Sequence, residues 1–346
     1  MITLFFAALC LAAPRAFAQP VDVSSATPNL PFANGSNTAP HSNRGIFAPA
    51  RGLVHPLVDI NVARSRKEPW VSALEDKTKA LVGQLKKEGL ASEISLEFVN
   101  IERTAQFDVN VAIGYRPASM VKLPIMIAYL KQHEDDPDLL NRRLTLLPMP
   151  PQPFTPEFPP KRRLPPGKDY SINELLQAMI SRSDNDAAYT LFTYMHSGEL
   201  AHLYEDLGVA GPEANNPNQL VTVHDLSTFL RILYVGGYLS WDHSQQALEY
   251  LAASDFSEGL RALLPPGTTI AHKFGEAGSV DGTSTQVHDC GFIYHPKGPY
   301  MLCVLTRGTD QHRQAAAIAR ISKLIYDEID ASLAEKNAAP QSKTAK

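Results

Sequence analysis

The sequence predicts a two-lobed α/β (α+β) fold, in which an antiparallel five-stranded sheet is packed by terminal helices and carries an inserted all-helical lobe. Three observations predict it. Strand-like alternation of apolar and polar residues occurs in two places, before residue 112 and after residue 267. The residues between these places follow a helical periodicity. Helical patterns also open and close the globular part, and this order of elements favours an antiparallel sheet packed by the terminal helices.

The first three elements follow from spacing and from the residues that start and stop them. A helix begins at Pro69 and ends at Gly89, because a first-turn proline and a C-terminal glycine are favoured there. Apolar and polar residues then alternate over 93–98, which predicts a half-buried strand. A second strand over 107–111 follows a short turn, so we expect an antiparallel hairpin.

The central block, from residue 119 to about residue 265, is predicted to be helical. Ser171 to Glu174 form a capping box that starts one helix, and Thr222 caps another. A proline-rich loop, roughly 148–167, interrupts this block, and we expect it to be a surface excursion.

Strand character returns in the last part of the chain, with candidates over 268–275, 289–295 and 300–306. The last two flank Pro-Lys-Gly-Pro at 296–299, which is a favourable turn sequence. A final helix is expected over about 310–334.

We divide the chain into four parts. Residues 1–18 are an apolar run that ends in Ala-Phe-Ala, typical of a signal peptide cleaved after Ala18 and too short to span a bilayer stably. A buried N-terminal helix or a mis-chosen start codon remains the alternative. Residues 19–68 are predicted to be a disordered Pro/Ser/Asn-rich tether, and residues 336–346 a flexible tail.

The globular domain is therefore expected over 69–335. We assign 69–116 and 268–335 to the α/β lobe and 117–267 to the helical lobe. The predicted leader indicates an exported protein, periplasmic or extracellular, and we expect a monomer without a stable membrane span.

Charge and cysteine content exclude several classes of partner. The formal net charge is −4, and no basic run with interleaved aromatic residues occurs, so we expect no nucleic-acid partner. Cys290 and Cys303 could form a disulfide or remain two buried thiols. No Cys or His spacing matches a metal site, so we predict no metal and no cofactor.

Ser119-Met120-Val121-Lys122 is the first candidate for chemistry. A proline precedes it and an apolar run follows, which places Ser119 at a helix start with Lys122 one turn later on the same face. A serine hydroxyl needs a neighbouring base to act as a nucleophile, and a desolvated lysine can serve. The alternative is a helix cap followed by an exposed lysine.

Two further motifs could complete a site, although each has a structural alternative. In Ser183-Asp184-Asn185, a hydroxyl could relay a proton and an amide could hold a substrate or Lys122; the alternative is a helix N-cap turn. In Lys273-Phe274-Gly275-Glu276, the lysine would supply positive potential that depresses the pKa of Lys122, and Gly275 would let a substrate approach the backbone. The alternative is a lysine that protects an edge strand.

Taken in order, S-x-x-K, S-D-N and K-x-G resemble the signature of class A β-lactamases and penicillin-binding proteins over about residues 70–332. The stretches HKFGE and VHDCG look closest to the class A β-lactamase-related serine hydrolases. The resemblance implies acylation by a β-lactam or a peptidoglycan peptide. It implies these roles: nucleophile Ser119, base Lys122, proton relay Ser183, anchor Asn185, electrostatic partner Lys273, and an oxyanion hole from the backbone N–H groups of Ser119 and Glu276.

Two departures from the family pattern concern the substrate. Phe274 stands where the family usually has Thr or Ser, which helps hold the substrate carboxylate. Arg307 could compensate as a substrate-binding residue, or it is a solvated surface charge. The family's deacylating glutamate has only Glu213 as a nearby candidate, with the wrong spacing to its asparagine, so we expect slow or no β-lactam turnover.

Neighbouring strand residues face opposite sides, so His288 and Asp289 should not form a catalytic pair, and His272 should point away from the site if Lys273 points in. Three functions remain open. The leading one is an exported β-lactamase-like serine hydrolase, the second a penicillin-binding-protein-like D,D-peptidase that deacylates slowly, and the third a non-catalytic cell-wall binding module.

Overall fold

The computed structural model describes residues 69–338, with gaps at 101–104, 152–153, 197, 212–219 and 279–281. The predicted leader and tether and the candidate Glu213 lie outside the described residues, as do residues 339–346 of the predicted tail; residues 336–338, which were also assigned to the flexible tail, are instead the end of the last helix.

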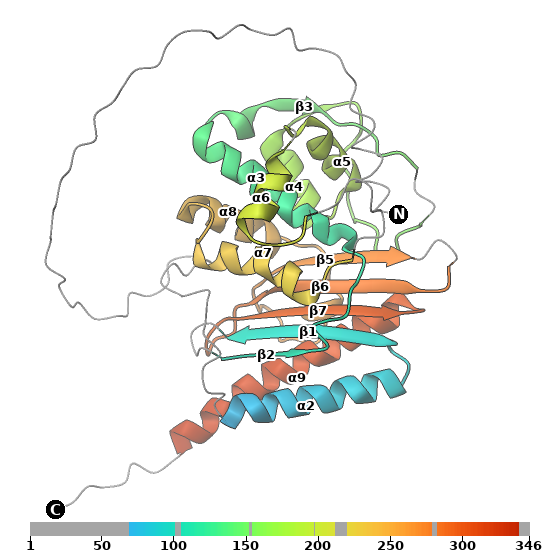
Figure 1. The fold of residues 1–346 in the computed structure, drawn as a ribbon, viewed down its shortest axis with the longest axis vertical. Helices are drawn as coiled ribbons and strands as arrows, with labels where there is room; N and C mark the ends of the chain where they lie inside the picture. The colour runs from blue at the N-terminus through green and yellow to red at the C-terminus, as the bar shows by residue number, and fades with distance from the viewer. Residues whose placement is uncertain are drawn as a thin grey trace, which may run out of the picture.

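A single antiparallel sheet of five strands forms the middle of the molecule (Figure 1). Its strands are β1 (Glu93–Asn100), β2 (Ala105–Val109), β5 (Ile270–Gly278), β6 (Thr285–Ile293) and β7 (Tyr300–Gly308). They lie in the order β2-β1-β7-β6-β5, and β1 and β2 pair as the expected hairpin. The predicted five-stranded antiparallel sheet is confirmed.

The two terminal helices, α2 (Pro69–Lys87) and α9 (Gln311–Ala338), pack together on one face of this sheet (Figure 1). Most apolar residues on their inner faces are buried; examples are Leu74 and Leu85 in α2 and Ile318 in α9. This burial removes apolar surface from water on both helices and on the sheet, which is the main source of their stability.

The helical elements cover the opposite face (Figure 1). The α-helices are α3 (Lys122–Asp135), α4 (Ile172–Ser181), α5 (Asn185–Tyr194), α6 (Glu199–Asp206), α7 (Val223–Val235) and α8 (Trp241–Ala252). The short elements on this side are η1 (Ala118–Val121), η2 (Leu139–Asn141) and the paired strands β3 (Arg143–Thr145) and β4 (Asp169–Ser171). A third short element, η3 (Gly259–Arg261), packs against α9, where Ser322 donates a hydrogen bond to the Leu260 carbonyl. The predicted capping box at Ser171 is present, and Thr222 caps α7 as predicted, in this case also as a capping box with Asp225.

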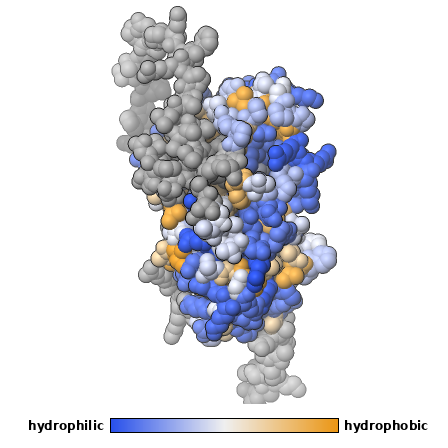
Figure 2. Space-filling view, turned by 90° about the vertical axis from the view of Figure 1, so that its right-hand side faces the viewer, coloured by the Kyte–Doolittle hydropathy of each residue, from blue (hydrophilic) through white to orange (hydrophobic). Residues whose placement is uncertain are grey.

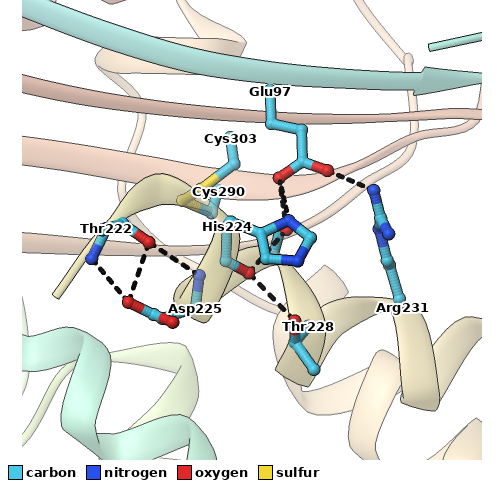
Figure 3. A network of polar contacts seen from close by, with 9 residues as sticks. Glu97, Thr222, His224, Asp225, Thr228, Arg231, Cys290 and Cys303 are labelled. Carbon is cyan, nitrogen blue, oxygen red and sulfur yellow. Dashed lines mark hydrogen bonds and ion pairs between the residues drawn. A yellow bond between two sulfur atoms is a disulfide. The ribbon is translucent and has the colours of Figure 1, made fainter. Parts of the chain in front are cut away.

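Strand β1 is buried on both faces, so the expectation of a half-buried strand was wrong. Its polar residue Glu97 faces α7, where Ser227 donates a 2.6 Å hydrogen bond to it and Arg231 forms an ion pair with it (Figure 3). Burial alone would raise the pKa of Glu97, but the hydrogen bond from His224 and the Arg231 charge outweigh it and hold the pKa below its usual value. A buried ion pair therefore joins the sheet to the helical elements.

Cys290 of β6 lies directly opposite Cys303 of β7, and the two form a disulfide within the buried core. This resolves the two alternatives left open by the sequence in favour of the disulfide.

Hydrophilic side chains predominate in the coloured part of the face shown in Figure 2, where hydrophobic ones form small separate patches. Among the described helices, none has a stretch that is long and apolar enough to cross a membrane.

Candidate active site

Ser119 lies in η1, a single 3₁₀ turn that leads directly into α3. Residues three apart eclipse one another in a 3₁₀ turn, so Ser119 and Lys122 share a face. Ala118, immediately before the serine, has a left-handed φ of +51°. A non-glycine residue in this region is strained, and such strain is typical of functional sites. The turn leaves Ser119 only 7% exposed.

The ammonium group of Lys122 is buried and contacts the Ser183-Asp184-Asn185 motif. It donates hydrogen bonds to the Ser183 carbonyl at 2.7 Å, to the Ser183 hydroxyl at 3.1 Å and to Asn185 Oδ1 at 2.6 Å. Ser183 itself has a left-handed φ of +54°. The left-handed turn at Ser183 therefore directs the side chains of Ser183 and Asn185 toward Lys122.

The remaining member of the motif does what the structural alternative proposed. Asp184 is the N-cap of α5, and its Oδ1 accepts a hydrogen bond from the Ala187 N–H at 3.0 Å. The motif is therefore a helix cap and a lysine-binding turn at once.

Lys273 approaches the same place from β5. Its ammonium donates to the Ser183 hydroxyl at 3.0 Å and to the Phe274 carbonyl at 2.6 Å, and the side chain is 1% exposed. The structure thus brings the three distant motifs together around one hydroxyl group.

Burial lowers the pKa of both lysines. It lowers the pKa of Lys122 to about 7, although nearby carboxylates such as Asp184 act to raise it. The pKa of Lys273 is lowered well below its usual range by burial and then by the Lys122 charge. We expected Lys273 to depress the pKa of Lys122; burial is the leading cause instead. A lysine with a pKa near 7 is neutral often enough to accept a proton.

Gly275 lies against the backbone of the nucleophile turn. A Cβ atom added to Gly275 would be 3.1 Å from the Ser119 nitrogen and 3.3 Å from the Met120 nitrogen. Only a residue without a side chain lets β5 come this close to the turn. The close approach places the backbone of the K-x-G motif beside the Ser119 N–H.

A cavity of about 260 Å³ opens at these motifs. Its lining includes Ser119, Ser183 and Asn185 from the first two motifs, and Phe274 and Glu276 from the third. The cavity is lined by the serine and by Ser183 and Asn185, which bind the buried amine of Lys122. A hydroxyl group, a nearby amine that can be neutral and backbone N–H groups are what nucleophilic acyl transfer requires.

Arg307 does not lie among the described residues that line the cavity. Its guanidinium donates to the Gly114 carbonyl at 2.6 Å and lies over the Tyr115 ring. The structure therefore gives no support to Arg307 as a replacement for the missing hydroxyl at Phe274. The arginine that lines the cavity is Arg163, an exposed residue of the proline-rich loop.

The described residues of the proline-rich loop are exposed or half-buried, as expected for a surface excursion, but the loop has a further role that the sequence analysis missed. Residues of this loop, Pro150, Pro151, Phe154, Pro156, Phe158, Pro160 and Arg163, line the cavity. The sequence contained one signal for this role: the connection between β3 and β4 is long and has no regular structure, and such loops are usually functional.

Glu276 contributes a second feature that sequence reasoning missed. We assigned it a role only through its backbone N–H, but its side chain lines the cavity and accepts hydrogen bonds from the loop. Burial raises the pKa of this carboxyl group, although the loop N–H groups partly offset it.

The histidines beside the motifs are structural. His272 is fully buried, with its Nδ1 2.8 Å from Asp289 Oδ1 on the neighbouring strand. His288 faces the other way, with its Nε2 2.8 Å from the Arg116 carbonyl. Within the described residues, no group of three or more His, Cys, Asp or Glu side chains could hold a metal ion.

A family model described as the β-lactamase enzyme family matches residues 73–329. Over 209 residues, the chain is 25% identical to a β-lactamase of Bacteroides uniformis; the match covers 52% of this chain and 66% of that protein. It is 26% identical over 181 residues to the extended-spectrum β-lactamase PER-1 of Pseudomonas aeruginosa, covering 46% and 58%. The chain thus spans 66% of the length of the first relative and 58% of the length of the second, in both cases less than two thirds.

Solved structures show the same fold. A mutant of PBP-A, in an acyl-enzyme complex with penicillin G, superposes with a TM-score of 0.60 at 24% identity, covering 75% of this chain and 97% of that one. A class A β-lactamase from Bacteroides cellulosilyticus gives a TM-score of 0.62 at 20% identity, covering 75% and 99%.

Proposed function

Because the chain belongs to the β-lactamase enzyme family, we propose that it is an exported serine hydrolase that is acylated on Ser119 by a β-lactam or a related amide or ester. The observation that carries the proposal is the convergence of Lys122 and Lys273 on the Ser183 hydroxyl beside the cavity that Ser119 lines. Export is proposed from the leader pattern at 1–18, and N-terminal sequencing of the mature protein tests it.

In the proposed reaction, Ser119 Oγ attacks the carbonyl carbon of the substrate, and the hydroxyl proton passes to the neutral amine of Lys122. The carbonyl oxygen becomes an oxyanion, stabilised by the backbone N–H groups of Ser119 and Glu276. As the carbon–nitrogen bond breaks, the proton moves from Lys122 through the Ser183 hydroxyl to the leaving nitrogen. The product is an ester on Ser119.

Asn185 and Lys273 position the groups that move the proton. The 2.6 Å bond to Asn185 holds the Lys122 amine, and the 3.0 Å bond from Lys273 holds the Ser183 hydroxyl. Both bonds are made by buried or half-buried groups, so water competes little for them.

A second candidate, a penicillin-binding-protein-like D,D-peptidase with slow deacylation, is favoured by a specific observation. Among the described residues that line the cavity, Asp186 and Glu276 carry the carboxylates that could activate a water. Asp186 accepts a bond from the Met149 N–H at 2.7 Å, and Glu276 accepts one from the Glu157 N–H at 2.9 Å. Both carboxylates already hold the proline-rich loop, which leaves them fewer lone pairs for orienting a deacylating water.

Labelling with a fluorescent penicillin tests the proposal. We expect a covalent band with the wild-type protein that disappears in Ser119→Ala. A wild-type protein that never labels would favour the non-catalytic binding module. Turnover of a chromogenic cephalosporin then separates the two enzyme candidates: a β-lactamase gives many turnovers per protein, and a trapped peptidase gives about one.

A further inference from the structure

The middle of the proline-rich loop is fastened to the strand that carries the K-x-G motif. The Glu276 carboxylate accepts hydrogen bonds from the backbone N–H groups of Glu157 at 2.9 Å and Phe158 at 3.2 Å. The Gln311 side-chain amide donates a further bond to it at 2.8 Å. Glu276 is 6% exposed, and bonds to a buried charged acceptor are the strong ones.

The two ends of the loop are fastened to the segment that carries the S-D-N motif. Asp186 Oδ1 accepts a bond from the Met149 N–H at 2.7 Å, and Asp184 Oδ2 accepts one from the Leu164 N–H at 3.2 Å. Backbone amides that proline leaves available in this loop are thus used to hold it. The loop is therefore joined at three places to the same two motifs that surround Ser119.

Held in this position, the loop presents aromatic rings to the cavity. The Phe158 ring packs edge-to-face on Phe274 and on Phe256, with centroid distances of 6.4 Å and 5.3 Å. Phe154 lies so close to β5 that a Cβ added to Gly278 would be 2.5 Å from its ring. Together with the prolines named above, these rings form an apolar wall; we call it the Phe154/Phe158 wall.

We infer that Glu276 is a positioning residue whose carboxylate holds the Phe154/Phe158 wall over Ser119, and that this wall selects acyl donors with an aromatic or other bulky apolar substituent. Apolar groups of a substrate gain free energy by leaving water, roughly in proportion to the area they bury. If the loop were free to move, its side chains would bury less of the apolar substituent of the substrate. The substrate preference rests on the acylation of Ser119 proposed above; the clamp itself does not.

Two penicillins that differ in the predicted feature test the preference. Benzylpenicillin carries a phenylacetyl group, whereas 6-aminopenicillanic acid has the same reacting ring without it. The readout is the ratio of their second-order acylation rate constants, since any loss common to both cancels. We expect the wild-type ratio to be at least about tenfold. In Glu276→Gln, which removes the charge and places an amide N–H₂ near the loop donors, it should fall severalfold toward 1.

Two further variants keep the test sharp. Gly278→Ala presses on the Phe154 ring from β5 and should lower the ratio without touching Glu276. Asp327→Asn is the matched control: it removes an exposed carboxylate of α9, paired with Lys323 at 2.8 Å, and should leave the ratio at the wild-type value.

Amide hydrogen exchange tests the clamp without any substrate. We expect faster exchange across 154–164 in Glu276→Gln than in the wild type and in Asp327→Asn. Unchanged exchange overturns the clamp. Faster exchange with an unchanged substrate ratio overturns the selective role of the wall. If the wild-type protein forms no acyl-enzyme with either penicillin, both the proposed function and the substrate preference are rejected. The hydrogen-exchange result then still tests whether Glu276 holds the loop.

Discussion

Lys122 and Lys273, which are 151 residues apart in the sequence, donate hydrogen bonds to the same hydroxyl oxygen, that of Ser183, at 3.1 Å and 3.0 Å. Two buried ammonium groups this close repel each other, so at least one gives up its proton more easily than a free lysine. The shared oxygen therefore links the charge of one lysine to the basicity of the other.

The first prediction concerns pH. Lys122 accepts a proton only as the neutral amine, and its pKa is about 7. The rate constant for acylation by benzylpenicillin should therefore rise about tenfold per pH unit below pH 7 and level off above it. Stopped-flow measurements from pH 5 to pH 9 check this. A rate that does not change between pH 5 and pH 7 would show that Lys122 is not the base.

Replacing the second lysine should lower the rate without moving this profile. Burial, not the Lys273 charge, is the leading cause of the lowered pKa of Lys122. In Lys273→Met the pH midpoint should therefore stay near 7, and the plateau rate should fall by about 10²-fold because the bond to the Ser183 hydroxyl is lost. The same pH series on this variant measures both quantities; a midpoint that moves upward would show that the Lys273 charge sets the pKa of Lys122, and an unchanged plateau would contradict the positioning role of Lys273.

Gly275 should not tolerate a side chain. In Gly275→Val, atoms of the new side chain would meet the backbone nitrogens of Ser119 and Met120, which cannot move without displacing the nucleophile turn. We expect acylation to slow by about 10²-fold, the scale for losing one oxyanion donor.

Gly83→Ala is the control for this change, because Gly83 is an exposed position of α2 with no atom within 4 Å of an added Cβ. It should acylate at the wild-type rate. Equal rates for the Gly275 variant and the wild type would contradict the close approach of β5 to Ser119.

The ion pair between β1 and α7 should contribute to stability. Glu97→Gln leaves the Arg231 guanidinium, whose side chain is 16% exposed, without its charged partner. We expect a loss of about 3 kcal/mol of unfolding free energy at pH 7, because breaking a buried pair leaves an uncompensated charge. Urea unfolding of both proteins measures it.

The same pair sets a pH dependence. The folded-state pKa of Glu97 is below the ordinary value of 4.5, so the pair stabilises the fold fully above that pH, and this contribution is lost as pH falls through the folded-state pKa. The difference between wild type and Glu97→Gln should therefore shrink in urea titrations below pH 4. A difference that stays constant down to pH 3 would contradict an ionised Glu97.

The sequence predicted what depends on local pattern. The sheet, the terminal helices and the helix caps at Ser171 and Thr222 follow from hydrophobic periodicity and from the residues that start and stop helices, and the structure confirms them. That Ser119, Lys122 and Lys273 lie close together in the fold could be expected only from the order of the S-x-x-K, S-D-N and K-x-G motifs.

The parts that failed depend on contacts between distant residues. The position of the proline-rich loop depends on hydrogen-bond acceptors from α5 and β5, such as Asp186 and Glu276. The loop sequence alone does not indicate these partners. Burial of Glu97 depends likewise on Arg231, 134 residues later. The place of Arg307 is fixed by the Gly114 carbonyl, which no strand pattern reveals.

The most direct test of the account is the intact mass of the protein after benzylpenicillin is added, followed over time and combined with peptide mapping. The account predicts an increase equal to the mass of the penicillin, located on the peptide that contains Ser119, slow to disappear, and absent in Ser119→Ala. An unmodified wild-type mass at every time point, or an adduct that persists in Ser119→Ala, would contradict it.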